Sequence, residues 1–295
     1  MQTDMGLGMV NGHVIGRTVK ETVHRAIIRA RTERAVFESF KKPDYNGQMD
    51  ADVATSADHK VQAIYVRMIE ECFPNAGIIA EEVEPNTKVP LVVSPKNGCR
   101  AYFTIDPIDG TRAYIRRQSH GIATMIALVL DGTVISAYVG DVNTNEIIGY
   151  RPDSEHVFRI SGFEHFEELG PPEQTDLSEL YVMLRDPPPW YSLTTQALLP
   201  KFKNYEIMGS SIGTWMARLW KREVGAVIMS DGTETPWDST PIIGITRKLG
   251  YVFMRPTENG AWEMYEPELP TSVFERPFDT MIVHSNIAEQ FTRLT

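Results

Sequence analysis

One short stretch, FTIDPIDGTRAYIR at residues 103–116, constrains this chain more than any other part of the sequence. It places Asp106 and Asp109 three positions apart around Pro107, and a Gly-Thr pair turns the chain immediately afterwards. Two carboxylates this close repel each other, and a hydrophobic core gains nothing from them. They therefore lie either in a solvated turn or around a shared positive charge.

The sequence before this stretch is helical, and the sequence after it has the pattern of strands. Apolar spacing predicts a long helix at residues 14–40 and a second whose stripe runs from Val61 to Cys72. Thr55 or Ser56 can cap the second helix, and Pro74 ends it. Residues 101–105 form a short strand that enters the turn. Strands at 121–130 and 133–142 form a hairpin, and 145–150 can add a third strand.

The second half of the chain alternates strands with helices. Strands are expected at residues 180–184, 225–230, 251–254 and 280–285, and helices at 214–221 and 238–248, which is an α/β pattern. The polar region 151–179 separates the two halves. We therefore expect residues 1–155 to form a lobe of helices and antiparallel sheet, and residues 156–295 to form a smaller α/β lobe.

Composition excludes several classes of function. The net charge of −10 opposes binding to nucleic acid and to anionic membranes. No apolar run approaches the ~18 residues of a membrane span, and the first residues do not form a secretory signal. Two cysteines in 295 residues indicate a reduced, cytoplasmic, soluble protein.

Four acidic clusters stand at expected element boundaries, where side chains readily converge on one cleft. They are Asp58 in DVATSAD, Glu81-Glu82 in GIIAEE, the Asp106 and Asp109 pair, and Asp238 in TPWDST. Several carboxylates in one cleft need a cation, and ligation by oxygen alone favours Mg²⁺. Each motif alone also has a structural interpretation, as a capped turn, a strand ending in solvent or a helix cap.

The turn itself adds a place for an anion. Pro107 fixes the backbone so that both aspartates and the Ile108 carbonyl can face one point. Gly110 lets the backbone approach a ligand, and Thr111 opens a segment with free amide groups that suit a phosphate. Metal carboxylates beside such amides are typical of a phosphate-ester hydrolase.

DPIDGTRAY, with GIIAEE upstream and WDSTP downstream, resembles the inositol monophosphatase family of Mg²⁺-dependent, lithium-sensitive phosphatases. The resemblance runs from about residue 52 to about residue 250. It implies a layered α/β sandwich of alternating helices and sheets, like that of fructose-1,6-bisphosphatase, and a homodimer.

The resemblance also implies a role for each motif residue. Two or three Mg²⁺ ions would be bound by Glu81, Asp106, the Ile108 carbonyl, Asp109 and Asp238. Thr111, with Asp58 and Glu81, would activate a metal-bound water, and the Gly110 and Thr111 amides would hold the phosphate. Asp231, Ser210 and Ser211 would bind the substrate. Glu234, or a capped turn around Gly232 with no substrate role, is the alternative to Asp231.

Three departures from the family pattern leave the substrate open. Ser239-Thr240-Pro241 follow the Trp-Asp pair, Asn46-Gly47-Gln48 stand where a lysine is frequent, and Glu206 stands where an arginine is frequent. We therefore expect a Mg²⁺-dependent phosphatase for inositol phosphate, histidinol phosphate, a sugar phosphate or a nucleotide-type 3′-phosphate. The alternative is an inactive member that only binds phosphate or metal. The arginines after the turn, with His120, would contact an anionic substrate or form a solvated face.

Overall fold

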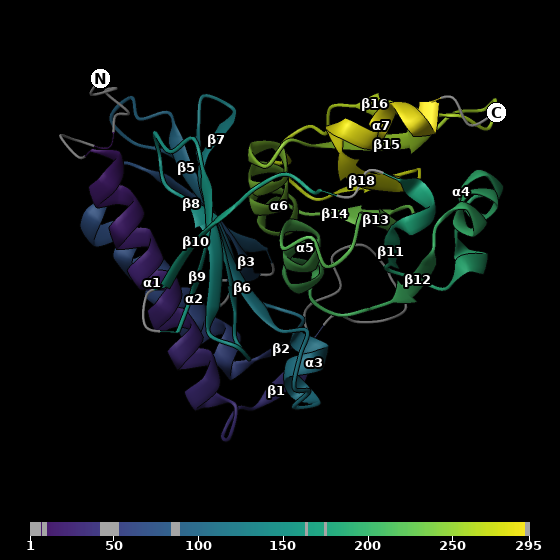
Figure 1. The fold of residues 1–295 in the computed structure, drawn as a ribbon. Helices are drawn as coiled ribbons and strands as arrows, with labels where there is room; N and C mark the ends of the chain where they lie inside the picture. Colours follow the sequence, from purple (N-terminus) through teal and green to yellow (C-terminus); the bar gives the residue numbers. More distant parts are fainter. Residues whose placement is uncertain are drawn as a thin grey trace.

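The computed structural model describes residues 7, 11–41, 53–83, 89–162, 165–173 and 176–292. Two β-sheets alternate with layers of helices (Figure 1), as the sequence predicts. The outer face of the first sheet is covered by α1 (Gly12–Glu33) and α2 (Ser56–Cys72). Between the sheets lie α5 (Ile212–Trp220) and α6 (Pro236–Lys248). The outer face of the second sheet is covered by α4 (Leu193–Leu198) and α7 (Ser285–Thr292).

The first sheet has eight strands in the order β10-β9-β8-β7-β6-β5-β3-β4, antiparallel except for the parallel pair β3–β5. Its strands are β3 (Gly77–Val83), β4 (Pro90–Val93), β5 (Ala101–Asp109), β6 (Ala123–Leu130), β7 (Thr133–Asp141), β8 (Glu146–Tyr150), β9 (Val157–Ser161) and β10 (His165–Leu169). The predicted hairpin is β6–β7. Its turn residues Asp131 and Gly132 both have positive φ, as a type I′ turn requires.

The second sheet has six strands in the order β12-β11-β13-β18-β15-β16. They are β11 (Tyr181–Leu184), β12 (Asn204–Ile207), β13 (Ala226–Met229), β15 (Tyr251–Pro256), β16 (Trp262–Tyr265) and β18 (Thr280–His284). Two small ribbons complete the strands: β1 (Ser39–Lys41) pairs with β2 (Val53–Thr55), and β14 (Gly232–Glu234) pairs with β17 (Phe274–Arg276). A short helix, α3 (Thr111–Ile115), follows β5.

The structure corrects three details of the predicted elements. The first helix ends at Glu33, well before residue 40, because residues 39–41 pair with β2. Cys72 is exposed at the last position of α2, and Phe73 fills the core there instead. The strand predicted at residues 101–105 continues to Asp109.

The first sheet also extends further along the chain than residue 155. Strands β9 and β10 belong to it, so its last strand ends at Leu169 and the second sheet begins at Tyr181. The division into two lobes stays a prediction. The chain passes from the first sheet to the second between Leu169 and Tyr181, later than the predicted boundary at residue 155. The region 42–50, which includes Asn46-Gly47-Gln48, lies outside the described residues.

The core between the two sheets ties them together. Helix α6 packs on β5, β6 and β7 of the first sheet and on β15 of the second. At Gly244 the helix lies so close to β7 that an added Cβ would be 2.6 Å from Val134 Cγ1. Pro241 lies inside α6 without ending it. Among the described residues, every helix is too short or too polar to cross a membrane.

Candidate active site

A bulge at the end of β5 brings Asp106 and Asp109 to the same face of the sheet. Asp106 pairs with Met125 of β6 and Asp109 pairs with Ala123, so three steps on β5 match two steps on β6. Residues three apart in a regular strand point to opposite faces, and the extra residue of the bulge removes that difference. Pro107, which cannot donate to the sheet, lies within this bulge.

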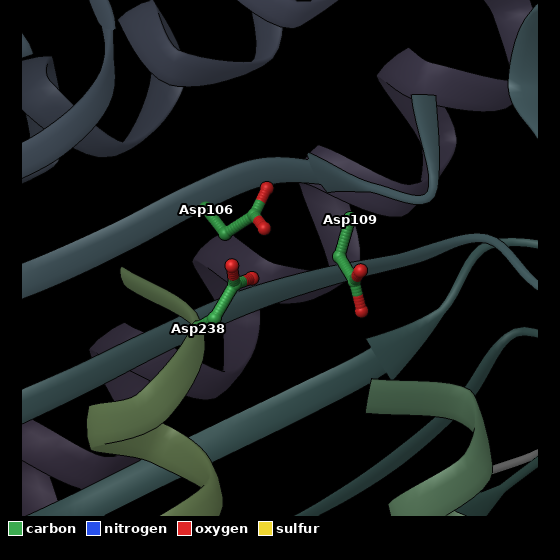
Figure 2. Close-up of side chains that lie close together, drawn as sticks. All are labelled: Asp106, Asp109 and Asp238. Atoms are coloured by element: carbon green, nitrogen blue, oxygen red, sulfur yellow. The ribbon is translucent and has the colours of Figure 1, made fainter. Parts of the chain in front are cut away.

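Asp238 reaches the same place from α6. It occupies the first turn of the helix, after the N-cap residue Thr235. Figure 2 shows the carboxylates of Asp106 and Asp238 facing each other, with Asp109 beside them. Carboxylate oxygens of the three residues lie within 4.8 Å of one another. Asp238 thus joins Asp106, which lies 132 positions earlier in the chain, in one acidic cluster.

Burial and mutual repulsion dominate the electrostatics of this cluster. Burial raises the pKa of Asp106 well above its usual range, and the charges of Glu81, Asp238 and Asp109 raise it further. Burial and the charge of Asp238 raise the pKa of Asp109 to about 7, against hydrogen bonds that lower it. Burial and the charge of Glu81 raise the pKa of Asp238 to about 6. The cluster therefore favours either protons or a cation.

The donor atoms fit a hard divalent cation. Among the described residues, Asp106 Oδ1 is buried and has no hydrogen-bond partner. A buried carboxylate oxygen without a partner costs free energy that a metal ion would recover. Glu81 and the Ile108 residue line the same cavity as the three aspartates, so the oxygen donors lie together.

Three carboxylates of the site each accept a hydrogen bond from the hydroxyl of a residue that caps the start of a helix. The pairs are Thr55 Oγ1 to Asp58 Oδ2 (2.5 Å) at α2, Ser211 Oγ to Asp109 Oδ2 (2.6 Å) at α5, and Thr235 Oγ1 to Asp238 Oδ2 (2.8 Å) at α6. Asp109 also accepts from the amides of Ile212 (3.1 Å) and Gly213 (2.7 Å). Each helix start thus fixes the position of one carboxylate.

Thr111 lies between a carboxylate and a carbonyl. Its hydroxyl is 3.4 Å from Asp58 Oδ1 and 3.0 Å from the Ile108 carbonyl oxygen. Gly110, just before it, has φ of 90°, and a Cβ there would also collide with the Gly121 carbonyl. Only glycine can make this turn.

Glu81 is fixed from the opposite side of β3. Gln62 of α2 donates to the Glu82 carbonyl (3.0 Å) and accepts from the Glu82 amide (2.8 Å). Glu82 itself is buried, whereas Glu81 lines the cavity. The helix thereby holds the end of β3 so that the two glutamates point to different sides.

The acidic cluster opens into a cavity of about 730 Å³. The cavity contains most of the site residues expected from the sequence: Glu81, Asp106, Ile108, Asp109, Gly110, Thr111, Ser210 and Asp238. Three expected residues do not line it. Asp58 lies behind Thr111, Ser211 is buried against Asp109, and Asp231 is exposed at the end of β13. Ser210 Oγ, although at the cavity, donates to the Gly121 carbonyl (2.7 Å).

The rim of the cavity is polar and includes several basic side chains. It includes Arg112, Arg116 and His120 after the turn, and Arg185 and Asp186 after β11. Asp186 accepts from Ser230 Oγ (2.7 Å). Arg185 and Asp186 were not expected from the sequence, although they directly follow a strand, as Glu81 and Asp106 were expected to do. Glu206 pairs with Arg218 (2.7 Å) and lies outside the cavity lining.

The chain matches one known family over most of its length. The model of the inositol monophosphatase family matches residues 17–281. No curated protein matches the sequence.

Solved structures share the fold at low sequence identity. An inositol monophosphatase/NADP phosphatase, complexed with NADP and Ca²⁺, has a TM-score of 0.72 and 18% identity over 96% of this chain and 95% of that one. An inositol monophosphatase/NADP phosphatase with Mg²⁺ and phosphate has a TM-score of 0.70 and 17% identity over 95% and 94%. The suhB protein of Bartonella henselae has a TM-score of 0.69 and 14% identity over 95% and 97%.

Proposed function

This chain belongs to the inositol monophosphatase family of phosphoric monoester hydrolases, and we propose that it hydrolyses a small, hydroxylated phosphate monoester with the help of Mg²⁺. The observation that carries the proposal is the buried cluster of Asp106, Asp109 and Asp238, whose oxygens lie within 4.8 Å of one another. A related structure holds Mg²⁺ and phosphate, which agrees with that cluster as the metal site.

The ligands would be the oxygens of Glu81, Asp106, Asp109, Asp238 and the Ile108 carbonyl. Asp106 Oδ1, buried and without a partner among the described residues, supports this assignment. When bound, two or three Mg²⁺ ions would supply a Lewis acid for the phosphate and lower the pKa of water. The raised pKa values of Asp109 and Asp238 mean that protons would compete with the metal.

Thr111 and Asp58 would orient the attacking water. The Thr111 hydroxyl can donate its hydrogen bond to Asp58 Oδ1 or to the Ile108 carbonyl. Its oxygen can accept a hydrogen bond from water, and a water proton can pass to Thr111 as the Thr111 proton passes to Asp58. Asp58, buried and held by Thr55, stays fixed during this exchange.

The Gly110 and Thr111 amides would hold the phosphate, because the first amides of a helix have no acceptor inside it. The rim would hold the rest of the substrate. Arg112, Arg116 and Arg185 suit a molecule with further anionic or hydroxyl groups and disfavour one that carries an ammonium group, such as histidinol phosphate. We therefore favour an inositol phosphate, a sugar phosphate or a nucleotide 3′-phosphate.

The family further implies inhibition by lithium and a homodimer. The acidic net charge agrees with a protein that binds neither nucleic acid nor membrane. A cytoplasmic location belongs to the same proposal. Light scattering after size exclusion tests the dimer directly.

Phosphate release measured over a panel of phosphate esters tests the function. Activity should disappear in a chelator, return on titration with Mg²⁺ and fall by at least ~10² in Asp238→Asn. An inactive metal-binding member would bind Mg²⁺ in a calorimeter and release no phosphate from any ester. Full activity in metal-free buffer would contradict the proposal.

A further inference from the structure

A second cavity, of about 270 Å³, adjoins α6 and shares no lining residue with the carboxylate cavity. It lies between α6 and strands of the second sheet, beside the β14–β17 ribbon. An apolar void of ~150 Å³ is already enough to bind benzene. A hollow of this size therefore has room for a small ligand.

The walls of this second cavity are aromatic and aliphatic. Phe253 and Tyr265 meet edge to face at 6.3 Å, and Tyr265 and Phe278 do so at 5.2 Å. Ile242 and Ile243 of α6, both buried, also line the cavity. Rings already arranged edge to face can add another ring in an offset or edge contact.

The polar groups in the walls have partners of their own. The Tyr265 hydroxyl shares a hydrogen bond with Thr280 Oγ1 at 2.7 Å. Glu234 accepts from Arg276 Nε at 2.7 Å and from Ser239 Oγ, so the buried arginine and the glutamate neutralise each other. A charged ligand would lose its hydration here and find no free opposite charge, so it would bind poorly.

The exposed residues of the lining also favour an uncharged ligand. Glu268, which is exposed, would repel an anion at the entrance, whereas Glu266 pairs with Arg247 at 2.6 Å. Phe274, 43% exposed, offers a further ring beside them. The lining thus selects an uncharged, flat, apolar molecule.

Two wall residues are directly linked to the acidic cluster. Ile212 lines the second cavity, and its amide donates to Asp109 Oδ1 at 3.1 Å. Ser239 also lines it and follows Asp238 in the first turn of α6. A molecule in the cavity would pack against the helix starts that hold two of the carboxylates.

We propose that this cavity binds a neutral aromatic molecule of one or two fused rings, and that binding is coupled to the acidic cluster through Ile212 and Ser239. The site is separate from the phosphate cavity. The carboxylate oxygens already lie within 4.8 Å of one another, as a shared cation requires, so an occupant that stabilises these positions of Asp109 and Asp238 would strengthen Mg²⁺ binding. By reciprocity, Mg²⁺ would tighten binding of the aromatic molecule by the same factor.

Titration calorimetry with indole as the probe tests the site on the full chain, with and without Mg²⁺. One indole should bind per chain with a dissociation constant of about 0.1–1 mM, as expected for a ligand of this size. Mg²⁺ should lower that constant by about threefold. Indole binding without Mg²⁺ does not depend on the proposed function. The Mg²⁺ arm rests on the proposed metal site, and a Mg²⁺ titration without indole tests that site separately.

Two variants locate the binding. Phe274→Ala removes an exposed ring of the lining and should weaken indole binding by about 3–10-fold. Ile243→Phe places an extra ring inside the cavity and should abolish it. Phe166→Ala is the matched control, since Phe166 is a 52% exposed phenylalanine on β10 of the other sheet. It should bind indole like the wild type.

Four results would overturn the proposal. The first is the absence of saturable indole binding up to several millimolar. The second is equal binding in Phe274→Ala and Phe166→Ala. The third is an indole dissociation constant that Mg²⁺ leaves unchanged, which would remove the coupling. The fourth is competition between indole and inorganic phosphate, which would place indole in the phosphate cavity.

Discussion

At the scale of single residues, the Thr111 hydroxyl has one proton and two acceptors. Asp58 Oδ1 lies 3.4 Å away and the Ile108 carbonyl oxygen 3.0 Å away. A hydroxyl that can change its acceptor without moving its oxygen can orient a water in the cavity, and it can receive a proton from that water as it passes its own proton to Asp58. Neither acceptor needs to leave its place, because one is backbone and the other is buried and capped.

We predict that Thr111→Ala lowers kcat by about 10², the usual contribution of a positioned proton acceptor. Mg²⁺ affinity should change little, because the Thr111 side chain is not among the proposed ligands. Steady-state kinetics and a Mg²⁺ titration separate the two effects. Thr111→Ser keeps the hydroxyl and should retain most of the activity. Near-normal turnover in Thr111→Ala would remove the water-orienting role.

Two aspartates that follow neighbouring strands are candidates for binding the hydroxyl groups of the substrate, and mutation can distinguish them. Asp186 follows β11 and lines the cavity, whereas Asp231 follows β13 and is exposed. A lost hydrogen bond to a substrate hydroxyl costs about 1–3 kcal/mol. Asp186→Ala should therefore lower kcat/KM for an inositol phosphate by about tenfold and leave p-nitrophenyl phosphate nearly unchanged.

Asp231→Ala serves as the matched control and should leave both substrates unaffected. A selective loss on inositol phosphate in Asp231→Ala would favour the role expected from the sequence. Equal losses on both esters in Asp186→Ala would mean that Asp186 supports the fold through Ser230.

The sequence predicted that Asp106, Asp109 and Asp238 converge, because each stands at an element boundary, where side chains readily meet in one cleft. It did not predict what their neighbours do. Ser211 belongs to a small-residue turn that the resemblance assigns to substrate, yet its hydroxyl bonds to Asp109. Which way a small polar side chain points depends on the docking of α5 against the first sheet, and no local pattern encodes that contact.

At the scale of elements, helix starts and carboxylates stabilise each other. A capping hydroxyl normally satisfies an amide of its own helix. At α2, α5 and α6 the same hydroxyl also donates to a site carboxylate. Removing one such hydroxyl should therefore affect both stability and the site.

Ser211→Ala should lower the free energy of unfolding by about 1 kcal/mol. It should also raise the Mg²⁺ concentration needed for half-maximal activity, because Asp109 loses one of its three donors. Ser192→Ala is the matched control. Ser192 caps α4 and donates to Asp279 Oδ2 at 2.6 Å, outside the cavity lining. It should lose similar stability, measured by denaturant titration, with unchanged Mg²⁺ dependence.

Most elements could be predicted from the sequence because their apolar spacing is regular. The strands of the β6–β7 hairpin and the helices α5 and α6 were expected within about two residues of their bounds. The bulge in β5 was not expected, because Pro107 and the two aspartates have the local sequence pattern of a turn. Only pairing with β6 shows that the strand continues. Short edge strands such as β10 have too little periodicity to predict.

At the scale of the whole molecule, the acidic cluster makes stability depend on pH. Carboxyls with an ordinary pKa of 3.8 are held in the fold at about 7 for Asp109 and about 6 for Asp238. Between pH 4 and pH 7 the folded state therefore binds protons that the unfolded state has released. Stability from these groups is full below pH 4 and is lost as the pH rises through 7.

The metal-free protein should accordingly melt at a lower temperature at pH 8 than at pH 5, by on the order of 5 °C. Saturating Mg²⁺ should remove most of the difference, because it replaces the protons. Calorimetric scans with a chelator and with Mg²⁺ measure both effects. Asp238→Asn removes one titrating group, so its metal-free melting temperature should fall less. A melting temperature independent of pH in the chelated wild type would contradict the argument.

The position of α6 between the sheets also has a consequence for how the protein is made. All eight strands of the first sheet leave the ribosome before α6, which ends about 80 residues after Leu169. At the usual rate of synthesis that interval is roughly 4–16 s. During it, the apolar face that α5 and α6 will cover, with Met125, Val139 and Ile148, has no cover. A nascent chain stalled in this interval should bind chaperones through this face more strongly than a released full-length chain, in which α5 and α6 cover it.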